Sequence, residues 1–106
     1  LNDKKGIVRY GSFMLPMDEA LALSVIDLSG RAFSKTDVKI KDERTSDFET
    51  VLLPHFFNSF AQASLSTIHI KQLDGSDTHH IIEAVFKSFA RALSEACSID
   101  EKKKDI

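Results

Sequence analysis

The sequence predicts an α+β fold, in which a four-stranded sheet carries two helices on one face. Three observations support this class. Four short segments either alternate apolar and polar residues or run apolar throughout, as strands do. Two longer segments place apolar residues at helical spacing, and polar stretches with glycine or proline separate the segments. In chain order these elements give βββαβα.

The first three elements are predicted strands. Ile7 to Leu15 mixes apolar and polar residues and stops near Pro16, which has no N–H to donate to a sheet. Ala20 to Leu28 is almost wholly apolar, which predicts a strand covered on both faces. Phe33 to Lys41 alternates apolar with charged residues toward its end, so this strand should have one face in water.

A polar loop and a helix follow. Residues 42–47 form the longest polar stretch, and Ser46 or Thr50 can cap the helix that begins after it. The helix is expected from Thr50 to Ser64, with Pro54 tolerated because it lies close to the first turn. Helical spacing directs four of its residues toward the core: Phe56, Phe57, Phe60 and Ala61.

The last two elements are a strand and a helix. Ser66 to Leu73 alternates apolar with polar residues and is ended by Asp74-Gly75. Asp77 or Thr78 can cap the final helix. The predicted apolar stripe of this helix consists of Ile82, Phe86, Phe89, Leu93 and Ala96.

Length and composition limit the possible functions. A chain of 106 residues favours one small domain. Lys and Arg number 14 against 16 carboxylates, so the basic excess of a nucleic-acid-binding protein is missing. No apolar run is long enough to span a membrane. The single cysteine, Cys97, excludes an internal disulfide and favours a cytoplasmic, reducing compartment, while the charged residues 97–106 are expected to fray.

The segment Thr78 to Glu83 carries the most informative chemistry. On a helix, Glu83 lies four residues after His79 and three after His80, so its carboxylate neighbours both imidazoles. Adjacent histidines point about 100° apart, which suits two metal ions better than one. The macrodipole at a helix N-terminus disfavours imidazolium and keeps the rings neutral, as metal coordination requires. The same spacing also fits two surface histidines with Glu83 paired to Lys87, and spacing alone leaves this choice open.

Other polar residues are weaker candidates. His55 shares a helix face with polar residues, which favours a solvent-facing histidine. Asp18 and Glu19 fit a turn with solvated carboxylates better than an acid–base pair. Arg9 and Arg31 each lie beside a glycine-containing segment, where a guanidinium either grips a phosphate or pairs with a nearby carboxylate.

Six short blocks, taken together and in order, resemble the imidazoleglycerol-phosphate dehydratase family. They lie within residues 4–96, nearly the whole chain, without large gaps. The blocks are Gly6-Ile7-Val8-Arg9-Tyr10-Gly11, Pro16-Met17-Asp18-Glu19-Ala20-Leu21, Asp27-Leu28-Ser29-Gly30-Arg31, Pro54-His55-Phe56-Phe57, Ile68-His69-Ile70 and His79-His80-Ile81-Ile82-Glu83-Ala84 through Phe86-Lys87. Their number and register are far more specific than a lone two-histidine motif.

The resemblance implies a metal-dependent hydro-lyase that dehydrates imidazole glycerol phosphate to imidazole acetol phosphate in L-histidine biosynthesis. It implies a duplicated subunit with a ribosomal S5 domain 2-like fold, in which residues 1–106 are the C-terminal half-domain. Two Mn²⁺ ions per complete subunit are implied, in sites shared between halves and between neighbouring subunits of a 24-chain homo-oligomer. The positions that match metal ligands are His55, His79, His80 and Glu83. The positions that match substrate phosphate-binding residues are Arg9, Arg31 and Lys87.

The sequence also departs from the family pattern. The N-terminal half, with its own His-His-x-x-Glu helix, is absent from these 106 residues, as is a Ser-Lys-Gly-type C-terminal tail. We therefore expect half of the active site to be missing and the chain alone to be inactive. The alternative is a non-catalytic metal-binding or assembly half-domain. The face that the family packs against the other half is expected to expose four residues that a second copy could cover: Phe57, Phe60, Phe86 and Phe89.

Overall fold

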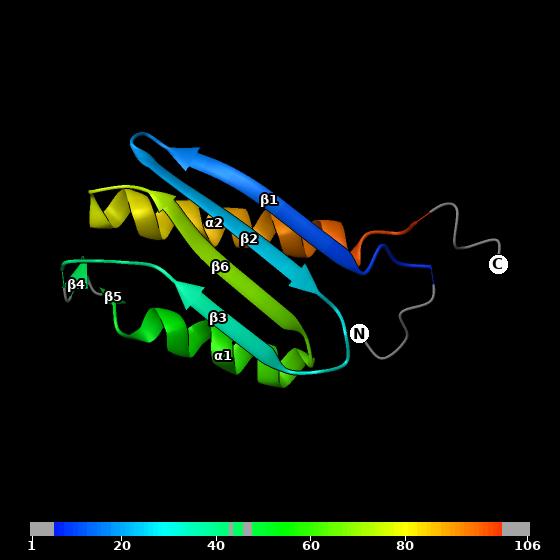
Figure 1. Cartoon of the computed structure of the whole chain (residues 1–106). Coiled ribbons are helices and arrows are strands. Elements are labelled where there is room, and N and C mark those ends of the chain that lie inside the picture. Colours follow the sequence, from blue (N-terminus) through cyan, green and yellow to red (C-terminus); the bar gives the residue numbers. More distant parts are fainter. Residues whose placement is uncertain (1–5, 43, 46–47, 101–106) are drawn as a thin grey trace.

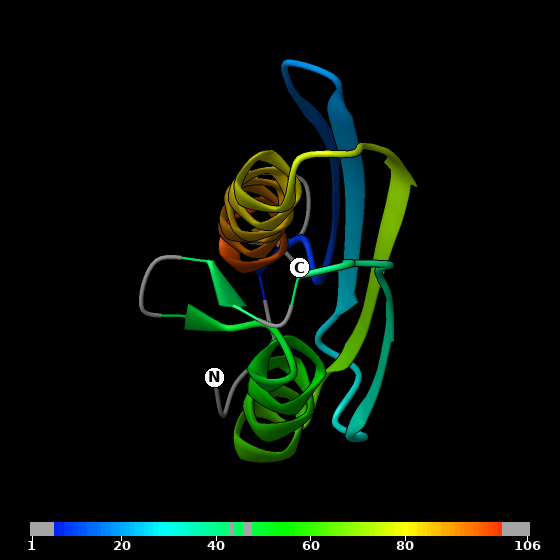
Figure 2. The same ribbon diagram turned by 90° about the vertical axis from the view of Figure 1, so that its left-hand side faces the viewer.

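A computed structural model describes residues 6–42, 44–45 and 48–100 of the chain. Its main sheet has four strands in the order β1-β2-β6-β3. These strands are β1 (Tyr10–Met17), β2 (Ala20–Asp27), β3 (Phe33–Asp37) and β6 (Thr67–Asp74). Two helices, α1 (Leu52–Ser64) and α2 (Thr78–Cys97), lie on one face of the sheet (Figure 1, Figure 2). The predicted α+β class is confirmed, with a small hairpin added before α1.

The connections set the strand directions. The turn at Asp18 and Glu19 joins β1 to β2 in antiparallel register, with Tyr10 opposite Asp27. β2 also pairs antiparallel with β6, whereas β3 pairs parallel with β6 because α1 carries the chain across between them. Asp18 has a φ of 50°, a left-handed conformation that Asp tolerates better than most residues. The turn therefore places two carboxylates together at one end of the sheet.

β1 begins and ends later than the sequence predicted. It includes Pro16, which pairs with Leu21 and is tolerated because β1 is an edge strand. Ile7, expected inside this strand, instead forms an isolated bridge with Ile99. The boundary prediction was wrong because it treated proline as a strand terminator wherever it occurs.

The segment after α2 is bonded to the segment before β1. The backbone N–H of Val8 donates to the carbonyl of Ser98 at 2.9 Å, and that of Asp100 donates to Gly6 at 2.7 Å. The predicted fraying is therefore wrong for residues 97–100. Residues 101–106, the rest of the predicted frayed tail, lie outside the described part of the chain.

β2 is fully buried on one face only. Its alternate residues Ala20, Ala22, Ser24 and Ile26 are at most 2% exposed, and the residues between them are half-buried. The predicted cover on both faces is wrong, because both helices lie on the same side of the sheet. β3 alternates half-buried with exposed residues, as predicted, but ends before residue 38.

The predicted polar loop contains a two-stranded hairpin, β4 (Arg44–Thr45) and β5 (Phe48–Glu49). Figure 2 shows this hairpin on the same side of the sheet as the helices. Thr50 does not cap α1, since its hydroxyl donates to the backbone carbonyl of Asp42 at 2.7 Å. The N-cap is Val51, which offers no side-chain hydrogen bond, and Ser46 lies outside the described residues.

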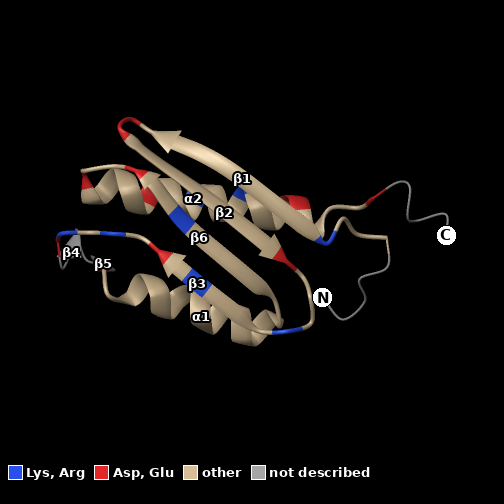
Figure 3. Cartoon of the chain, viewed as in Figure 1, with Lys and Arg blue, Asp and Glu red and all other residues tan. Residues whose placement is uncertain are grey.

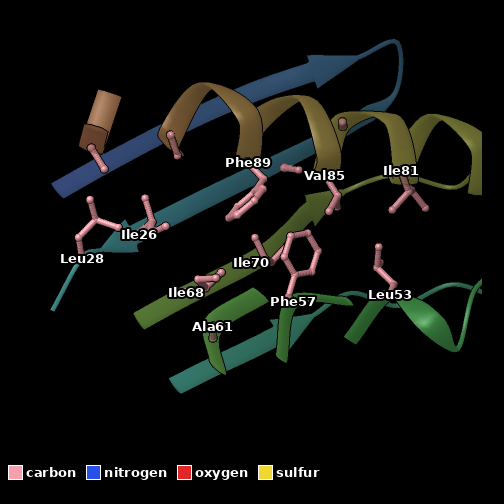
Figure 4. Packing of buried hydrophobic residues seen from close by; sticks show 14 of the residues in the cluster. Ile26, Leu28, Leu53, Phe57, Ala61, Ile68, Ile70, Ile81, Val85 and Phe89 are labelled. Carbon is pink, nitrogen blue, oxygen red and sulfur yellow. The ribbon is translucent and has the colours of Figure 1, made fainter. Parts of the chain in front are cut away.

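The hydrophobic core lies between the sheet and the two helices (Figure 4). Phe57 and Ala61 of α1 are fully buried as predicted, and Leu53, one turn earlier, joins them. Phe56 was predicted to face the core but is 42% exposed. In α2 the buried stripe is rotated from the predicted one and consists of Thr78, Ile81, Ala84, Val85, Ser88, Phe89, Ala92 and Ala96. Neither described helix combines the length and the apolar composition of a membrane-spanning segment.

Phenylalanine rings join the two helices to each other. Phe57 of α1 has its ring centroid 5.0 Å from Phe89 and 5.7 Å from Phe86 of α2. Phe57 is 0% exposed and Phe89 is 5% exposed, so the predicted apolar patch is wrong for these two residues. Phe60 and Phe86 are half-buried. The two helices bury most of this aromatic surface against each other within a single chain.

Candidate metal centre

The start of α2 is fixed by its own backbone and cap. Asp77 has extended backbone angles, and its carboxylate accepts the backbone N–H of His80 at 3.0 Å. This is the predicted N-cap, and it satisfies one of the unpaired donors of the first turn. His79 and His80 consequently lie in the first turn of a well-formed helix, where the prediction placed them.

The two imidazoles point in different directions, as the helical period requires. Their ring centroids are 6.4 Å apart and the ring planes make an angle of 65°. The side chain of His79 is 67% exposed, whereas that of His80 is 31% exposed. The two rings therefore belong to two different local environments.

His79 shares its side of the helix with Glu83. Its Nε2 lies 3.9 Å from a Glu83 carboxylate oxygen, and the other oxygen of Glu83 lies 3.2 Å from Nζ of Lys87. The pairing of Glu83 with Lys87 is the surface alternative that the spacing left open, and it coexists with the proximity of Glu83 to His79. This side of α2 offers one imidazole and one carboxylate, donors that suit Mn²⁺ as well as Zn²⁺.

His80 faces the turn between β1 and β2. Its Nδ1 lies 2.6 Å from Oε1 of Glu19, and its Nε2 lies 3.4 Å from a carboxylate oxygen of Asp18. Figure 3 shows acidic residues both at this turn and at the neighbouring start of α2. The hydrogen bond with Glu19 raises the pKa of His80 above its ordinary value. This environment opposes the effect of the helix dipole, which the sequence argument had taken to keep the ring neutral.

Glu19 is held by three hydrogen bonds. Its Oε2 accepts the backbone N–H groups of Ser76 and Asp77 at 2.8 and 2.9 Å, and its Oε1 meets His80. The two backbone donors, followed by His80, lower the pKa of Glu19 to about 2. The predicted turn with exposed carboxylates is confirmed, since the side chains of Asp18 and Glu19 are 77% and 39% exposed, but the hydrogen bonds of Glu19 to the start of α2 were not predicted.

His55 lies on the exposed side of α1. Within the described residues, no group of three or more His, Cys, Asp or Glu side chains is arranged to hold a metal ion. The chain brings His79 to Glu83 and His80 to the turn carboxylates, but it does not bring His55 to either pair. The donor types are ones that bind divalent metals, and in the described residues they lie in separate groups, His79 with Glu83 and His80 with the turn carboxylates.

The three predicted phosphate-binding cations lie on separate elements. Arg9, which precedes β1, contacts Asp27 through Nε at 2.8 Å and Nη2 at 3.4 Å, and its guanidinium lies 5.0 Å from the Tyr10 ring centroid. The hydrogen bond with Asp27 raises the pKa of Arg9. Arg31 is exposed in the connection from β2 to β3. Among the described contacts none joins Arg9, Arg31 and Lys87, so their convergence on a phosphate stays a prediction.

The fold and the site together define a class of protein: an α+β domain with a His-His-x-x-Glu segment at the start of its second helix. The chain belongs to the imidazoleglycerol-phosphate dehydratase family, whose family model matches residues 1–93. It is 50% identical over 102 residues to the imidazoleglycerol-phosphate dehydratase of Clostridium kluyveri and 47% identical over 106 residues to that of Microcystis aeruginosa. These matches confirm the resemblance drawn from the six blocks.

Solved structures agree with the sequence comparison. The crystal structure of imidazoleglycerol-phosphate dehydratase from Staphylococcus aureus superposes with a TM-score of 0.89 at 41% identity, covering 93% of this chain and 58% of that one. The Pyrococcus furiosus enzyme, in complex with (S)-C348, gives a TM-score of 0.82, covering 93% of this chain and 55% of that one. The matches cover 96% of this chain and 53% of the Clostridium relative, and 100% and 51% for the Microcystis relative. The chain thus spans about half the length of the curated relatives it matches.

Proposed function

We propose that this chain supplies one half of an imidazoleglycerol-phosphate dehydratase, a hydro-lyase of L-histidine biosynthesis. The observation that carries the proposal is the His79-His80-x-x-Glu83 segment in the capped first turn of α2, within a chain that matches the family over residues 1–93. The reaction removes a hydroxyl and a proton from neighbouring carbons of imidazole glycerol phosphate. The resulting enol becomes the ketone of imidazole acetol phosphate, with no redox change.

The metal ligands supplied by this chain would be His55, His79, His80 and Glu83. Mn²⁺, when bound, would act as a Lewis acid toward the imidazole ring of the substrate. The separation of the His79 and His80 rings supports two metal ions rather than one. Donors from the other half and from neighbouring subunits of a homo-oligomer would complete these sites, as the family resemblance implies.

Arg9, Arg31 and Lys87 would hold the substrate phosphate. Arg9 uses Nε and Nη2 toward Asp27, which leaves its Nη1 donors for an anion while the guanidinium plane stays fixed. Lys87 lies one helical turn from Glu83. The proposed phosphate-binding lysine and the proposed metal-binding carboxylate are therefore on the same side of α2. We place the enzyme in the cytoplasm, the reducing compartment that its single cysteine favours.

The proposal is tested by comparing the 106-residue chain with the complete enzyme, meaning this chain joined to the half that the relatives carry beyond it. We expect the complete enzyme to bind Mn²⁺ and dehydrate the substrate, and the chain alone to be inactive. His80→Ala and Glu83→Gln should each remove metal, measured by elemental analysis. Unchanged metal content in both variants would exclude the ligand assignment.

The phosphate assignment has a separate test. Arg31→Lys keeps the charge but loses the two-pronged guanidinium, so KM for the substrate should rise. Unchanged kinetics would make Arg31 a structural residue. If the complete enzyme binds metal without turnover, the chain is instead part of a non-catalytic metal-binding assembly.

A further inference from the structure

We propose that Glu19 is a positioning residue that fixes the tautomer of His80, holding the ring proton on Nδ1 so that the Nε2 lone pair is available to a divalent cation. The inference rests on the proposed function, in which His80 is a metal ligand. Glu19 lies in the turn between β1 and β2, 61 residues before His80, and reaches the start of α2 through three hydrogen bonds.

Backbone hydrogen bonds fix the orientation of the Glu19 carboxylate. Its Oε2 accepts two successive backbone N–H groups, those of Ser76 and Asp77, at 2.8 and 2.9 Å. A carboxylate bound in this way gives up two charge-assisted hydrogen bonds to the backbone if it turns toward solvent. Its second oxygen, Oε1, is thereby aimed at Nδ1 of His80, 2.6 Å away.

Two carboxylates compete for the single proton of the neutral ring. Glu19 lies at Nδ1, whereas Asp18 lies 3.4 Å from Nε2 and its side chain is 77% exposed. The shorter contact to the anchored carboxylate is the stronger one. Asp77 also approaches Nδ1, at 3.8 Å, but its oxygen already accepts the backbone N–H of His80. The proton therefore belongs on Nδ1. Nε2 then faces Asp18, whose carboxylate oxygen offers a second ligand atom for the cation.

His79 shows what the same helix does without such a partner. Its side chain is 67% exposed, and among the described contacts the carboxylate near it, that of Glu83, lies 3.9 Å from Nε2. Nothing at this distance selects one tautomer. The hairpin turn thus acts on one histidine of the pair, and a carboxylate in this outer position typically changes metal affinity by about 10–100-fold.

Glu19→Gln separates positioning from packing. The carboxamide oxygen can still accept from Ser76 and Asp77, and this places the NH₂ group against His80. An amide donor at Nδ1 forces the ring proton onto Nε2, so Nε2 no longer has a lone pair to offer a metal ion. We expect the Kd of the complete enzyme for Mn²⁺ to rise about 10–100-fold. The matched control is Glu95→Gln, because Glu95 also accepts a backbone N–H, that of Ser12 at 2.8 Å, on an exposed part of α2; its Kd should stay within about twofold of wild type.

The tautomer is measured directly by ¹⁵N NMR of the histidine side chains in the metal-free 106-residue chain at pH 9. We expect His80 to carry its proton on Nδ1 in wild type and on Nε2 in Glu19→Gln. A wild-type proton on Nε2, or an unchanged Kd for Glu19→Gln, would overturn the inference. A wild-type enzyme that binds no divalent metal would instead remove the proposed function, leaving the tautomer to decide the role of Glu19. If Glu19→Gln fails to fold while Glu95→Gln folds, the wild-type spectrum alone decides.

Discussion

The two helices that carry the candidate ligands differ in the hydrogen bonds that hold their N-terminal ends. α2 begins at a full cap, with Asp77 bonded to the first turn and Glu19 bonded to the loop before it. α1 begins at Val51, which is 74% exposed and offers no cap bond, and its histidine, His55, is exposed. Contacts within the chain therefore orient His80, one of the candidate ligands on α2. No described contact orients the ring of His55, so its orientation depends on what packs against α1.

The same contrast appears where the helices meet the sheet. α2 packs along β1 and β2, and Gly11 of β1 lies directly against the backbone of α2 at Ala92 and Ala96. α1 covers the other edge of the sheet, at β3. At their C-terminal ends, α1 stops at Leu65 in a left-handed conformation with φ 52°, whereas α2 stops at Ser98 with an unstrained φ of −72°. The relaxed, closely packed helix is the one that carries most of the candidate site.

The largest expected effect breaks the packing of α2. In Gly11→Ala the new methyl group would overlap the carbonyl oxygen of Ala92, a backbone atom that cannot move aside without shifting the helix. We expect the free energy of unfolding to fall by about 3 kcal/mol or more. Urea unfolding measures this, with Ser12→Ala as the control because Ser12 is exposed on the same strand. Equal stabilities for both variants would mean that α2 is not held as closely as described.

The second prediction compares the two helix starts. Asp77→Ala removes the cap bond to His80 N and should cost about 1 kcal/mol of unfolding free energy. Val51→Ala, at the equivalent position of α1, has no cap bond to lose and should cost less than about 0.5 kcal/mol. Thermal unfolding of both variants gives the difference. A Val51→Ala loss as large as that of Asp77→Ala would show that α1 is held at its start by something other than a cap.

A third prediction reverses the comparison at the helix ends. Leu65→Gly removes the cost of a left-handed leucine, about 1 kcal/mol, against a smaller loss of chain entropy, so stability should rise by about 0.5 kcal/mol. Ser98→Gly relieves no strain and loses the bond from the Ser98 hydroxyl to the carbonyl of Glu95, so stability should fall by a similar amount. Chemical denaturation should thus give opposite signs. The same sign in both would argue that the strain at Leu65 is not the deciding factor.

The periodicity of the sequence was sufficient to predict the main sheet and both helices, because their apolar faces repeat regularly. It missed the β4–β5 hairpin, whose strands of two residues are too short to show a period. It also placed Phe56 in the core, because spacing cannot tell which side of an aromatic cluster faces the neighbouring helix. Tertiary packing decides such cases.

The site was predictable only where its residues are close in the chain. His79, His80 and Glu83 lie within one helical turn and a half, so their proximity follows from the helix alone. The contacts of Glu19 with His80 and of Asp27 with Arg9 were not predicted, since the partners lie 61 and 18 residues apart in the chain. Asp27 could have been found: a two-residue turn at residues 18–19 places position 27 opposite position 10, next to Arg9, once Pro16 is allowed inside an edge strand.

The smallest expected effect is a pH dependence at the contact between Glu19 and His80, in the metal-free chain. The pKa of Glu19 is lowered from 4.5 to about 2, so its stabilising contribution is present above pH 4.5 and is lost as the pH falls toward 2. The pKa of His80 is raised above 6.5, so its contribution is present below pH 6.5 and is lost as the pH rises through the raised value. Both contributions are therefore complete together only between about pH 4.5 and 6.5.

This window gives a test that α1, with no equivalent contact in the described part, cannot mimic. The difference in Tm between wild type and Glu19→Gln, measured with a chelator present, should be greatest between about pH 4.5 and 6.5 and should shrink on both sides. The effect should be small, because both side chains remain partly exposed and solvent screens their interaction. Glu95→Gln, whose carboxylate contacts a backbone N–H and no histidine, should lack the decline on the alkaline side. A Tm difference for Glu19→Gln that stays constant up to pH 9 would show that His80 contributes nothing through this contact, and that the hairpin turn supports α2 through its backbone bonds alone.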